Sequence, residues 1–205
     1  MSRKRPTTGA VENVPMRASS QGWTACSAQN QRERKIVNPR NLVVSSAHLA
    51  TGGSPALSEL EYGVIIFSHG LSRWIVRCIA AAGLPGLSTI EILILHNVRH
   101  RNRPKTLSDL CLVLDIDDTH IASYAIKKLE SAGLVKTSKL GKEKVIESTP
   151  KAIAVLDKYT EIREQLLVSS VEQSGLSQEV LSKMAGNLRM VAGLYEQAAR
   201  SAATL

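Results

Sequence analysis

The sequence predicts a mainly α fold that carries one small β-hairpin. Three observations lead to this prediction. Apolar residues recur at alternating three- and four-residue spacing near both ends of residues 56–205, two short helical segments separated by a tight turn lie between them, and a lysine-rich segment centred on a glycine follows. Because the alternating spacing keeps apolar side chains on one helix face, we expect a long helix at each end of a compact helical domain.

Length and composition limit the classes of protein that fit. The chain has 205 residues, with 26 Lys and Arg against 18 Asp and Glu and a formal charge of +8. No uninterrupted apolar run approaches the ~18 residues of a membrane span, and no apolar segment follows the charged start, so we expect neither a membrane segment nor a signal peptide. Aromatic content of 3% disfavours a stacking platform for single strands. Cys26, Cys78 and Cys111 lack metal-ligand spacing, which disfavours a zinc finger or disulfide scaffold and favours a reducing compartment.

Most of the positive charge lies in residues 1–55. This segment holds eight Lys or Arg and two Glu, and it has no sustained apolar period. Such a segment buries too little surface to offset its ordering entropy, so we predict a disordered basic tail over 1–55. Two roles stay open for it, loose contact with nucleic acid and a solvated leader without a function.

The two long helices are predicted over residues 56–83 and 177–204. Ser54-Pro55 and Ser177 supply N-terminal caps, and Gly83 ends the first helix. Two apolar stripes exceed what the core of one small domain needs, so we expect a homodimer built from these helices; the alternative is that the stripes pack against each other within one chain. The expected dimerisation residues are Leu60, Val64, Phe67, Leu71 and Trp74 in the first helix, and Leu181, Met184, Leu188, Val191 and Tyr195 in the second.

A helix-turn-helix is predicted over residues 106–132. Ser88 with Glu91, and Thr106 with Asp109, form capping boxes that open two helices, the second reaching Leu114. After a three-residue break, Asp117 or Asp118 caps another helix that ends before Gly133. Two short helices joined in this way can place the second helix in a DNA major groove.

A basic hairpin is predicted over residues 134–148. Two short strands flank Leu140-Gly141-Lys142, and a hairpin directly behind a helix-turn-helix makes the arrangement called a winged helix. Thr149-Pro150 then starts a helix that is expected to bury a set of five apolar side chains: Ile153, Leu156, Tyr159, Ile162 and Leu166.

The second helix of the motif sorts into two faces. Ile121, Ala125 and Leu129 share one stripe that we expect to be buried, and polar side chains that can contact base edges or phosphates lie opposite. The alternative is an ordinary solvated face. The candidate DNA-binding residues are Thr106, Thr119, His120, Ser123, Tyr124, Lys127 and Lys128, with Lys136, Lys139, Lys142 and Lys144 in the hairpin.

Other chemistry has little support in the sequence. His96 and His100 lie four residues apart, but no further metal ligand stands at a fitting spacing. Cys78 and Cys111 fall on apolar faces and are expected to be small core residues rather than redox sensors. No nucleophile elbow, phosphate loop or paired-carboxylate constellation appears. We therefore expect no enzyme activity, no metal and no cofactor.

The order of elements over residues 56–205 resembles the MarR family of bacterial winged-helix transcription regulators. The most specific stretch is Leu112 to Lys151, which includes the phrase Leu129-Glu130-Ser131-Ala132-Gly133-Leu134-Val135. The resemblance implies a cytoplasmic, nucleoid-associated homodimer that binds specific double-stranded DNA and can respond to a small-molecule effector that the sequence does not identify. A winged-helix protein-assembly module and a non-specific, chromatin-like DNA binder are the alternatives.

The hairpin departs from the family pattern. The family usually carries Asp-x-Arg there, with an arginine that enters the minor groove, whereas this chain reads Lys142-Glu143-Lys144. Lys144 therefore stands at the arginine position. Because lysine lacks the planar fork of a guanidinium group, we expect it to contact phosphate.

Overall fold

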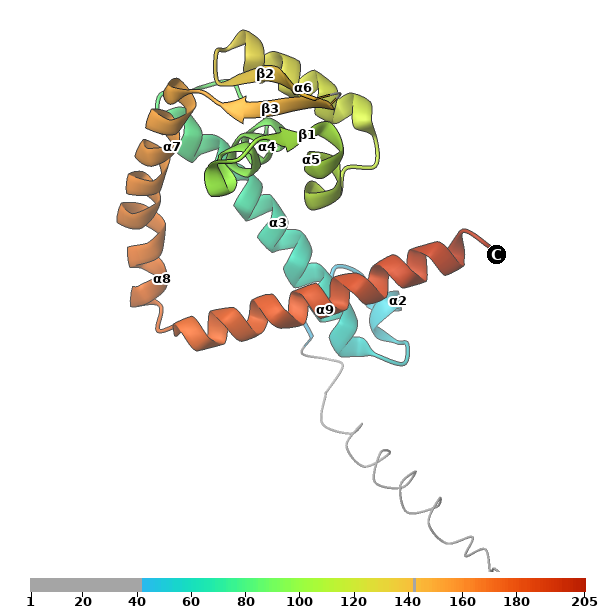
Figure 1. Ribbon diagram of the computed structural model, residues 1–205. Coiled ribbons are helices and arrows are strands. Elements are labelled where there is room, and N and C mark those ends of the chain that lie inside the picture. Colours follow the sequence, from blue (N-terminus) through green and yellow to red (C-terminus); the bar gives the residue numbers. More distant parts are fainter. Residues whose placement is uncertain (1–41, 142) are drawn as a thin grey trace, which may run out of the picture. The chain divides into compact units, whose positions relative to one another are not determined.

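The computed structural model describes residues 42–141 and 143–205 (Figure 1). Most of the predicted tail and Lys142 lie outside the described residues. The helices are α2 (Ala47–Ala50), α3 (Pro55–Ala81), α4 (Thr89–Arg99), α5 (Leu107–Leu114), α6 (Thr119–Ser131), α7 (Pro150–Arg163), α8 (Ser169–Gln173) and α9 (Gln178–Ala202). The strands are β1 (Lys105–Thr106), β2 (Val135–Leu140) and β3 (Glu143–Ser148), and shorter helical turns cover His100–Asn102 and Glu164–Val168.

The described residues divide into two units, and the boundary between them falls between Ile66 and Phe67, inside α3. Within the first unit, four residues of the predicted tail form the short helix α2. Here Ala50 is buried and the Thr51 hydroxyl donates a hydrogen bond to the His48 carbonyl at 2.7 Å.

Helix α3 is long and apolar enough, by length and composition, to cross a membrane. The sequence prediction considered only uninterrupted apolar runs, and charged residues such as Arg73 and Arg77 interrupt α3. A single helix of this kind is weak evidence for a membrane segment, because core helices of water-soluble proteins can be equally long and apolar. The end of α3 has such a role, since Ile75, Cys78 and Ile79 are buried in the hydrophobic core of the second unit.

The core of the second unit lies between α4, α5, α6, α7 and the sheet. Helix α4 contacts all of these helices and strand β3. The largest fully buried aliphatic side chains come from α3, α4, α5, α6, the segment after α6 and β3: Ile79, Ile92, Ile94, Leu95, Val98, Leu110, Leu129, Leu134 and Ile146. Each full burial of a large aliphatic side chain contributes about 1.5–3 kcal/mol, so these residues hold the helix-turn-helix and the hairpin on one support.

The sheet has three antiparallel strands in the order β1-β3-β2. The sequence predicted the hairpin β2-β3 but missed β1, whose two residues pair as Lys105 with Ile146 and Thr106 with Val145. Two residues are too few to show a period in sequence. The pairing attaches the hairpin to the start of α5.

The predicted caps of α4, α5, α6, α7 and α9 are confirmed. Ser88 and Thr106 close capping boxes, and the Asp118 side chain accepts a hydrogen bond from the backbone N–H of His120 at 2.8 Å. Thr149 and Ser177 cap α7 and α9. Gly133 ends α6 with φ at +71°, a conformation that favours glycine.

The prediction that Leu166 is buried is wrong. It lies in a π-helical turn, Glu164–Val168, and its side chain is exposed, whereas those of Leu167 and Val168 are half-buried. A π turn holds more residues than an α turn, so the apolar period of α7 does not continue through it.

Candidate nucleic-acid interface

Helix α6 is fixed to the core by one face. Ala122, Ala125, Ile126 and Leu129 are buried there. The short connection from α5 passes through Asp115, which has a left-handed backbone with φ at 53°. With one face of α6 held in this way, its opposite face is presented at the surface of the unit.

The prediction that Ile121 is buried is wrong. Its side chain is 51% exposed. At about 100° per residue, Ile121 lies roughly 90° from the centre of the face formed by the four buried residues, so it lies at the edge of the buried face. His120, Tyr124 and Lys127 are exposed as predicted, Ser123 is half-buried, and Thr119 is exposed at the first turn.

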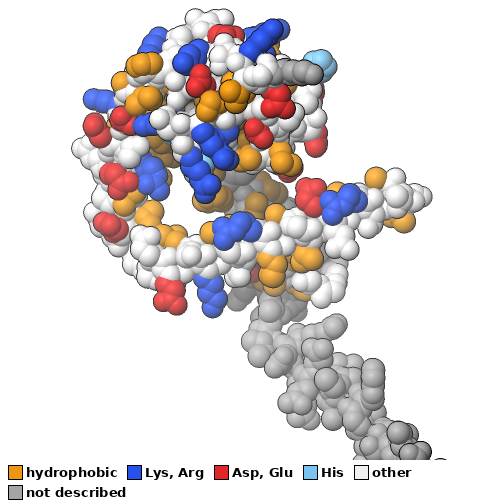
Figure 2. Space-filling model, in the orientation of Figure 1, with side chains coloured by type: hydrophobic (Ala, Val, Ile, Leu, Met, Phe, Trp, Pro, Cys, Tyr) orange, Lys and Arg blue, Asp and Glu red, His pale blue; other side chains and the backbone are white. Residues whose placement is uncertain are grey.

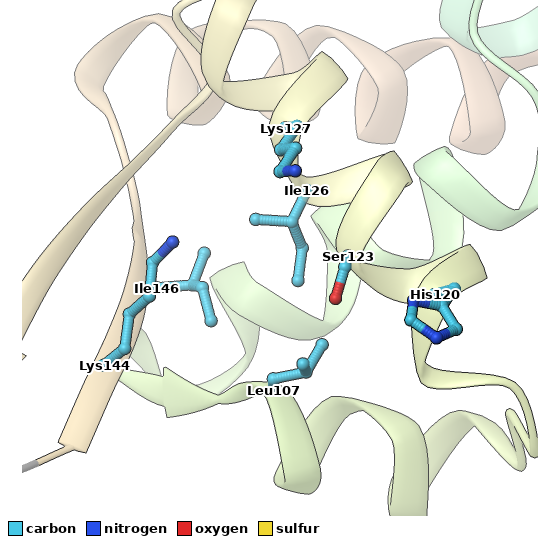
Figure 3. A pocket seen from close by; sticks show the side chains of 7 residues that line it. All are labelled: Leu107, His120, Ser123, Ile126, Lys127, Lys144 and Ile146. Carbon is cyan, nitrogen blue, oxygen red and sulfur yellow. The ribbon is translucent and has the colours of Figure 1, made fainter.

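A groove of about 390 Å³ separates α6 from the hairpin (Figure 3). Its floor is apolar, and Ile126 on α6 points towards Ile146 on β3. Polar groups stand along its rim: His120, Ser123 and Lys127 from α6 and Lys144 from β3. The groove thus brings predicted DNA-binding residues of both elements together. The sequence missed its floor residues Leu107, Ile126 and Ile146, because nothing in an apolar period distinguishes a groove floor from the core.

The hairpin lysines divide between the two faces of the sheet. Directly opposed residues point to the same face and alternate along each strand. Lys139 opposes Lys144 and shares its face with Ile146, which lines the groove, whereas Lys136 opposes Glu147 on the other face. Lys136 also forms an ion pair with Glu147 at 3.3 Å. The structure therefore brings Lys139 and Lys144 to the groove side and does not bring Lys136 there.

Lys139 and Lys144 form an unusual cross-strand pair. Both are exposed, and like charges directly opposite each other destabilise an antiparallel pair. An anion that contacts both ammonium groups relieves this repulsion. A phosphate group provides that charge and several hydrogen-bond acceptors.

Lys128, a predicted DNA-binding residue whose side chain is 41% exposed, is held by partners on the core side of α6. Its Nζ donates hydrogen bonds to Glu91 Oε2 at 2.9 Å and to the Gly86 carbonyl at 3.0 Å. Burial raises the pKa of the Glu91 carboxyl, but the hydrogen bonds from Lys128 and Ser88 outweigh this effect and hold the pKa below its usual range. The sequence identified Glu91 only as a capping residue, and its second partner lies 37 positions away.

Two further hydrogen bonds fix the interface elements. The Thr106 hydroxyl accepts the backbone N–H of Asp109 at 3.1 Å, so this predicted DNA-binding residue caps α5. The backbone N–H of Thr137 donates to Glu130 Oε1 at 3.2 Å. This second bond connects α6 to the base of the hairpin.

Charged side chains of both signs cover the surface of the second unit (Figure 2). Among the described residues, no group of three or more His, Cys, Asp or Glu is placed to hold a metal ion. His96 is largely buried and contacts the Tyr159 ring edge-on, with centroids 4.7 Å apart, and His100 is exposed. Cys78 and Cys111 are buried, as predicted.

Comparisons with known proteins agree with this geometry. Residues 87–152 match the family model of a winged helix DNA-binding domain. No curated protein matches the chain by sequence.

Similar solved structures include a MarR variant from E. coli complexed with operator DNA, with a TM-score of 0.56 and 14% identity over 68% of this chain and 98% of that one. The regulator BldR from Sulfolobus solfataricus gives a TM-score of 0.55 and 19% identity over 69% and 98%. A MarR family regulator from Neisseria meningitidis gives 0.57 and 13% over 70% and 95%. This chain therefore has the winged-helix fold of the MarR-family regulators, and its residues 87–152 are similar to a winged helix DNA-binding domain.

Proposed function

We propose that the protein is a transcription regulator that binds specific double-stranded DNA as a homodimer. The observation that carries this proposal is the groove between α6 and the hairpin, where Ser123, Lys127 and Lys144 converge. Helix α6 enters the major groove, and Lys139 and Lys144 contact the backbone beside it. Base contacts by α6 then specify the sequence, and phosphate contacts by the hairpin fix the register.

The homodimer is supported by two exposed apolar stripes. In α3, Leu60, Val64, Phe67 and Leu71 are exposed, and no residue of α9 is buried. Hydrophobic side chains are visible along the surface of α9 in Figure 2. Exposed apolar surface that continues along a helix is typical of protein–protein interfaces. Trp74 is not part of the exposed stripe, since it packs against the core. A twofold dimer presents two copies of α6 to half-sites about one helical turn apart.

The comparison structures support a DNA-binding function for this fold. The E. coli protein was crystallised with operator DNA, and a Rhodococcus jostii relative in fold, with a TM-score of 0.54, was crystallised with p-coumaroyl-CoA. We accordingly expect residues 56–205 to act as one DNA-binding unit in the cytoplasm, and to have no enzyme activity. A small-molecule effector of this chain is an expectation that rests on the resemblance alone.

A protein-assembly module is the second candidate. Leu112 and Val113 on α5 are 83% and 64% exposed, and Ile121 on α6 is 51% exposed. Exposed apolar groups of this kind favour contact with another protein. A non-specific DNA binder is the third candidate, and it differs from the proposal in that its affinity does not depend on sequence.

Selection of bound sequences from random duplexes, followed by two pairs of variants, tests the proposal. Ser123→Ala and Tyr124→Ala should each cost about 1–3 kcal/mol on the selected site and almost nothing on random duplex. Tyr124 is 70% exposed, and Ser123→Ala removes only a hydroxyl group from a half-buried side chain, so we expect both variants to fold. Lys139→Gln and Lys144→Gln should weaken binding to both duplexes and flatten the dependence of log affinity on log salt by about 0.9 per lost phosphate contact.

The two pairs serve as controls for each other. Equal losses on both duplexes for the Ser123 and Tyr124 variants indicate a non-specific binder. Unchanged binding for all four variants indicates that neither α6 nor the hairpin contacts DNA, and the assembly module becomes the better account.

A further inference from the structure

The loop from Arg99 to Lys105 is a second concentration of positive charge. It contains Arg99, Arg101, Arg103, Lys105 and His100 and no acidic residue. Arg101 and Arg103 are exposed. Within the described residues, no ion pair joins either of these two arginines to a carboxylate. The loop follows α4 and ends in β1, so it lies at the base of the hairpin.

The loop backbone is held in a costly conformation. Arg101 has φ and ψ of 58° and 13°, and Asn102 has φ of 48°. Left-handed backbone costs a residue other than glycine roughly 1–2 kcal/mol, so other contacts must fix two such residues in succession. Lys105 Nζ donates to the carbonyls of His100 at 3.2 Å and Arg103 at 3.4 Å, and Arg99 Nη1 donates to Asn102 Oδ1 at 3.4 Å.

Lys105 adds to the electrostatic cost of the loop. Only 6% of its surface is exposed, and its ammonium group contacts backbone carbonyls. Burial, together with the nearby Arg103 and Arg101, lowers the pKa of this lysine, and Asp109 opposes the effect. The fold thus gathers several cations in one loop, and the carboxylate of Asp109 offsets part of their charge. Backbone strain and clustered charge of this kind concentrate at functional sites.

The loop adjoins the face of the sheet that lies opposite the groove. A polar hollow of about 130 Å³ is lined by Asn102 and Arg103 from the loop side and by Lys136 and Glu147 from the hairpin. Because Glu147 lies in this hollow and pairs with Lys136, the hollow is poorly suited to a small free anion. The exposed arginines of an open loop suit an extended polyanion better.

We propose that Arg101 and Arg103 bind the phosphate backbone of duplex DNA that flanks the site read by α6. This inference rests on the proposed function. A duplex that lies in the groove and extends past the hairpin reaches the side towards which the opposite face of the sheet is turned, and the loop adjoins that face. The loop therefore adds phosphate contacts only when the duplex extends beyond the site.

Two duplexes that carry the same selected site test this inference. One ends at the site, about 20 base pairs for two half-sites, and the other extends by about two helical turns on each side. For the wild type, the slope of log affinity against log salt should be steeper on the long duplex by about 0.9 per additional phosphate contact. Arg101→Gln combined with Arg103→Gln should remove this difference and leave binding to the short duplex unchanged.

Two further variants make the test specific. Lys158→Gln with Arg163→Gln removes the same charge from the exposed face of α7 and should keep the length dependence. Arg101→Gly relieves the left-handed backbone, so it should unfold at the same temperature as the wild type or higher, and it should still reduce the length dependence. The Arg101→Gly variant thereby separates the loss of a phosphate contact from a loss of stability.

Each other outcome overturns the inference. If the wild type has equal slopes on both duplexes, or if the arginine variants weaken binding to the short duplex equally, the loop does not contact flanking DNA, although the proposed function stands. If a second, separate duplex is captured in place of flanking DNA, the assigned partner is wrong. If the wild type binds neither duplex, the proposed function itself fails.

Discussion

The winged-helix core and the long helix α9 use apolar residues in opposite ways. In the core, Leu110, Leu129 and Leu134 are fully buried, and each contacts a cluster built from several elements. Helix α9 has a regular apolar stripe, yet none of its residues is buried. An apolar period predicts that a helix forms and which face it will bury. It does not determine whether the partner is the same chain or a second one.

The largest expected effect tests whether the apolar stripes of α3 and α9 pack against a second copy of the chain. Leu71→Asp combined with Leu188→Asp places charges on the exposed stripes of α3 and α9, and a buried, unpaired charge is costly. We expect the wild type to sediment as a dimer at micromolar concentration and the variant as a monomer that binds a palindromic site poorly. Leu112→Asp, on the exposed surface of α5, is the matched control and should stay dimeric. A monomeric wild type would rule out the homodimer.

The second effect contrasts a core leucine with an exposed one. Leu129→Ala removes a fully buried side chain of α6 and should lower the free energy of unfolding by about 2–5 kcal/mol. Leu194→Ala makes the same chemical change on α9, at a position outside the apolar stripe, and should stay within about 0.5 kcal/mol of the wild type. Denaturant titration measures both. Similar losses would show that α9 is as well packed as the core.

Much of the second unit could be predicted from sequence because its signals are local. Capping boxes at Ser88 and Thr106, the proline after Thr149 and the left-handed Gly133 each act within one helical turn. Such signals locate helix ends without knowledge of tertiary contacts. The order of these elements was sufficient to predict a winged helix.

The site was predicted less completely because its remaining determinants are non-local. The groove depends on the distance between α6 and β3, and strand register places Lys136 away from Lys144. Lys128 follows Lys127 in the sequence of α6 and carries the same charge, but it pairs with Glu91, which lies on another helix. Ile121 has the composition of a core residue and lies at the edge of the buried face. Each of these outcomes depends on packing between elements far apart in sequence.

The pair Lys127 and Lys128 gives a third, smaller effect. Lys128→Met leaves the buried carboxylate of Glu91 without its ammonium partner, and an unsatisfied buried group costs about 1–3 kcal/mol. Lys127→Met makes the same change one residue earlier, on the exposed groove rim, and should affect DNA binding while leaving the free energy of unfolding within about 0.5 kcal/mol. If the two variants exchange these phenotypes, Lys128 is the residue that contacts DNA.

The smallest effect is confined to a narrow range of pH. Burial lowers the pKa of His96, whose ring packs edge-on against Tyr159 in the core. Between the lowered pKa and the ordinary value of 6.5, the unfolded chain binds more protons than the folded chain, so the free energy of unfolding rises with pH. We expect stability to fall as the pH decreases through 6.5 and this loss to stop below the folded-state pKa. His96→Gln should remove this part of the profile measured by denaturant titration, whereas His100→Gln should keep it, since that side chain is exposed. An unchanged profile for His96→Gln would show that the buried imidazole does not couple the fold to pH.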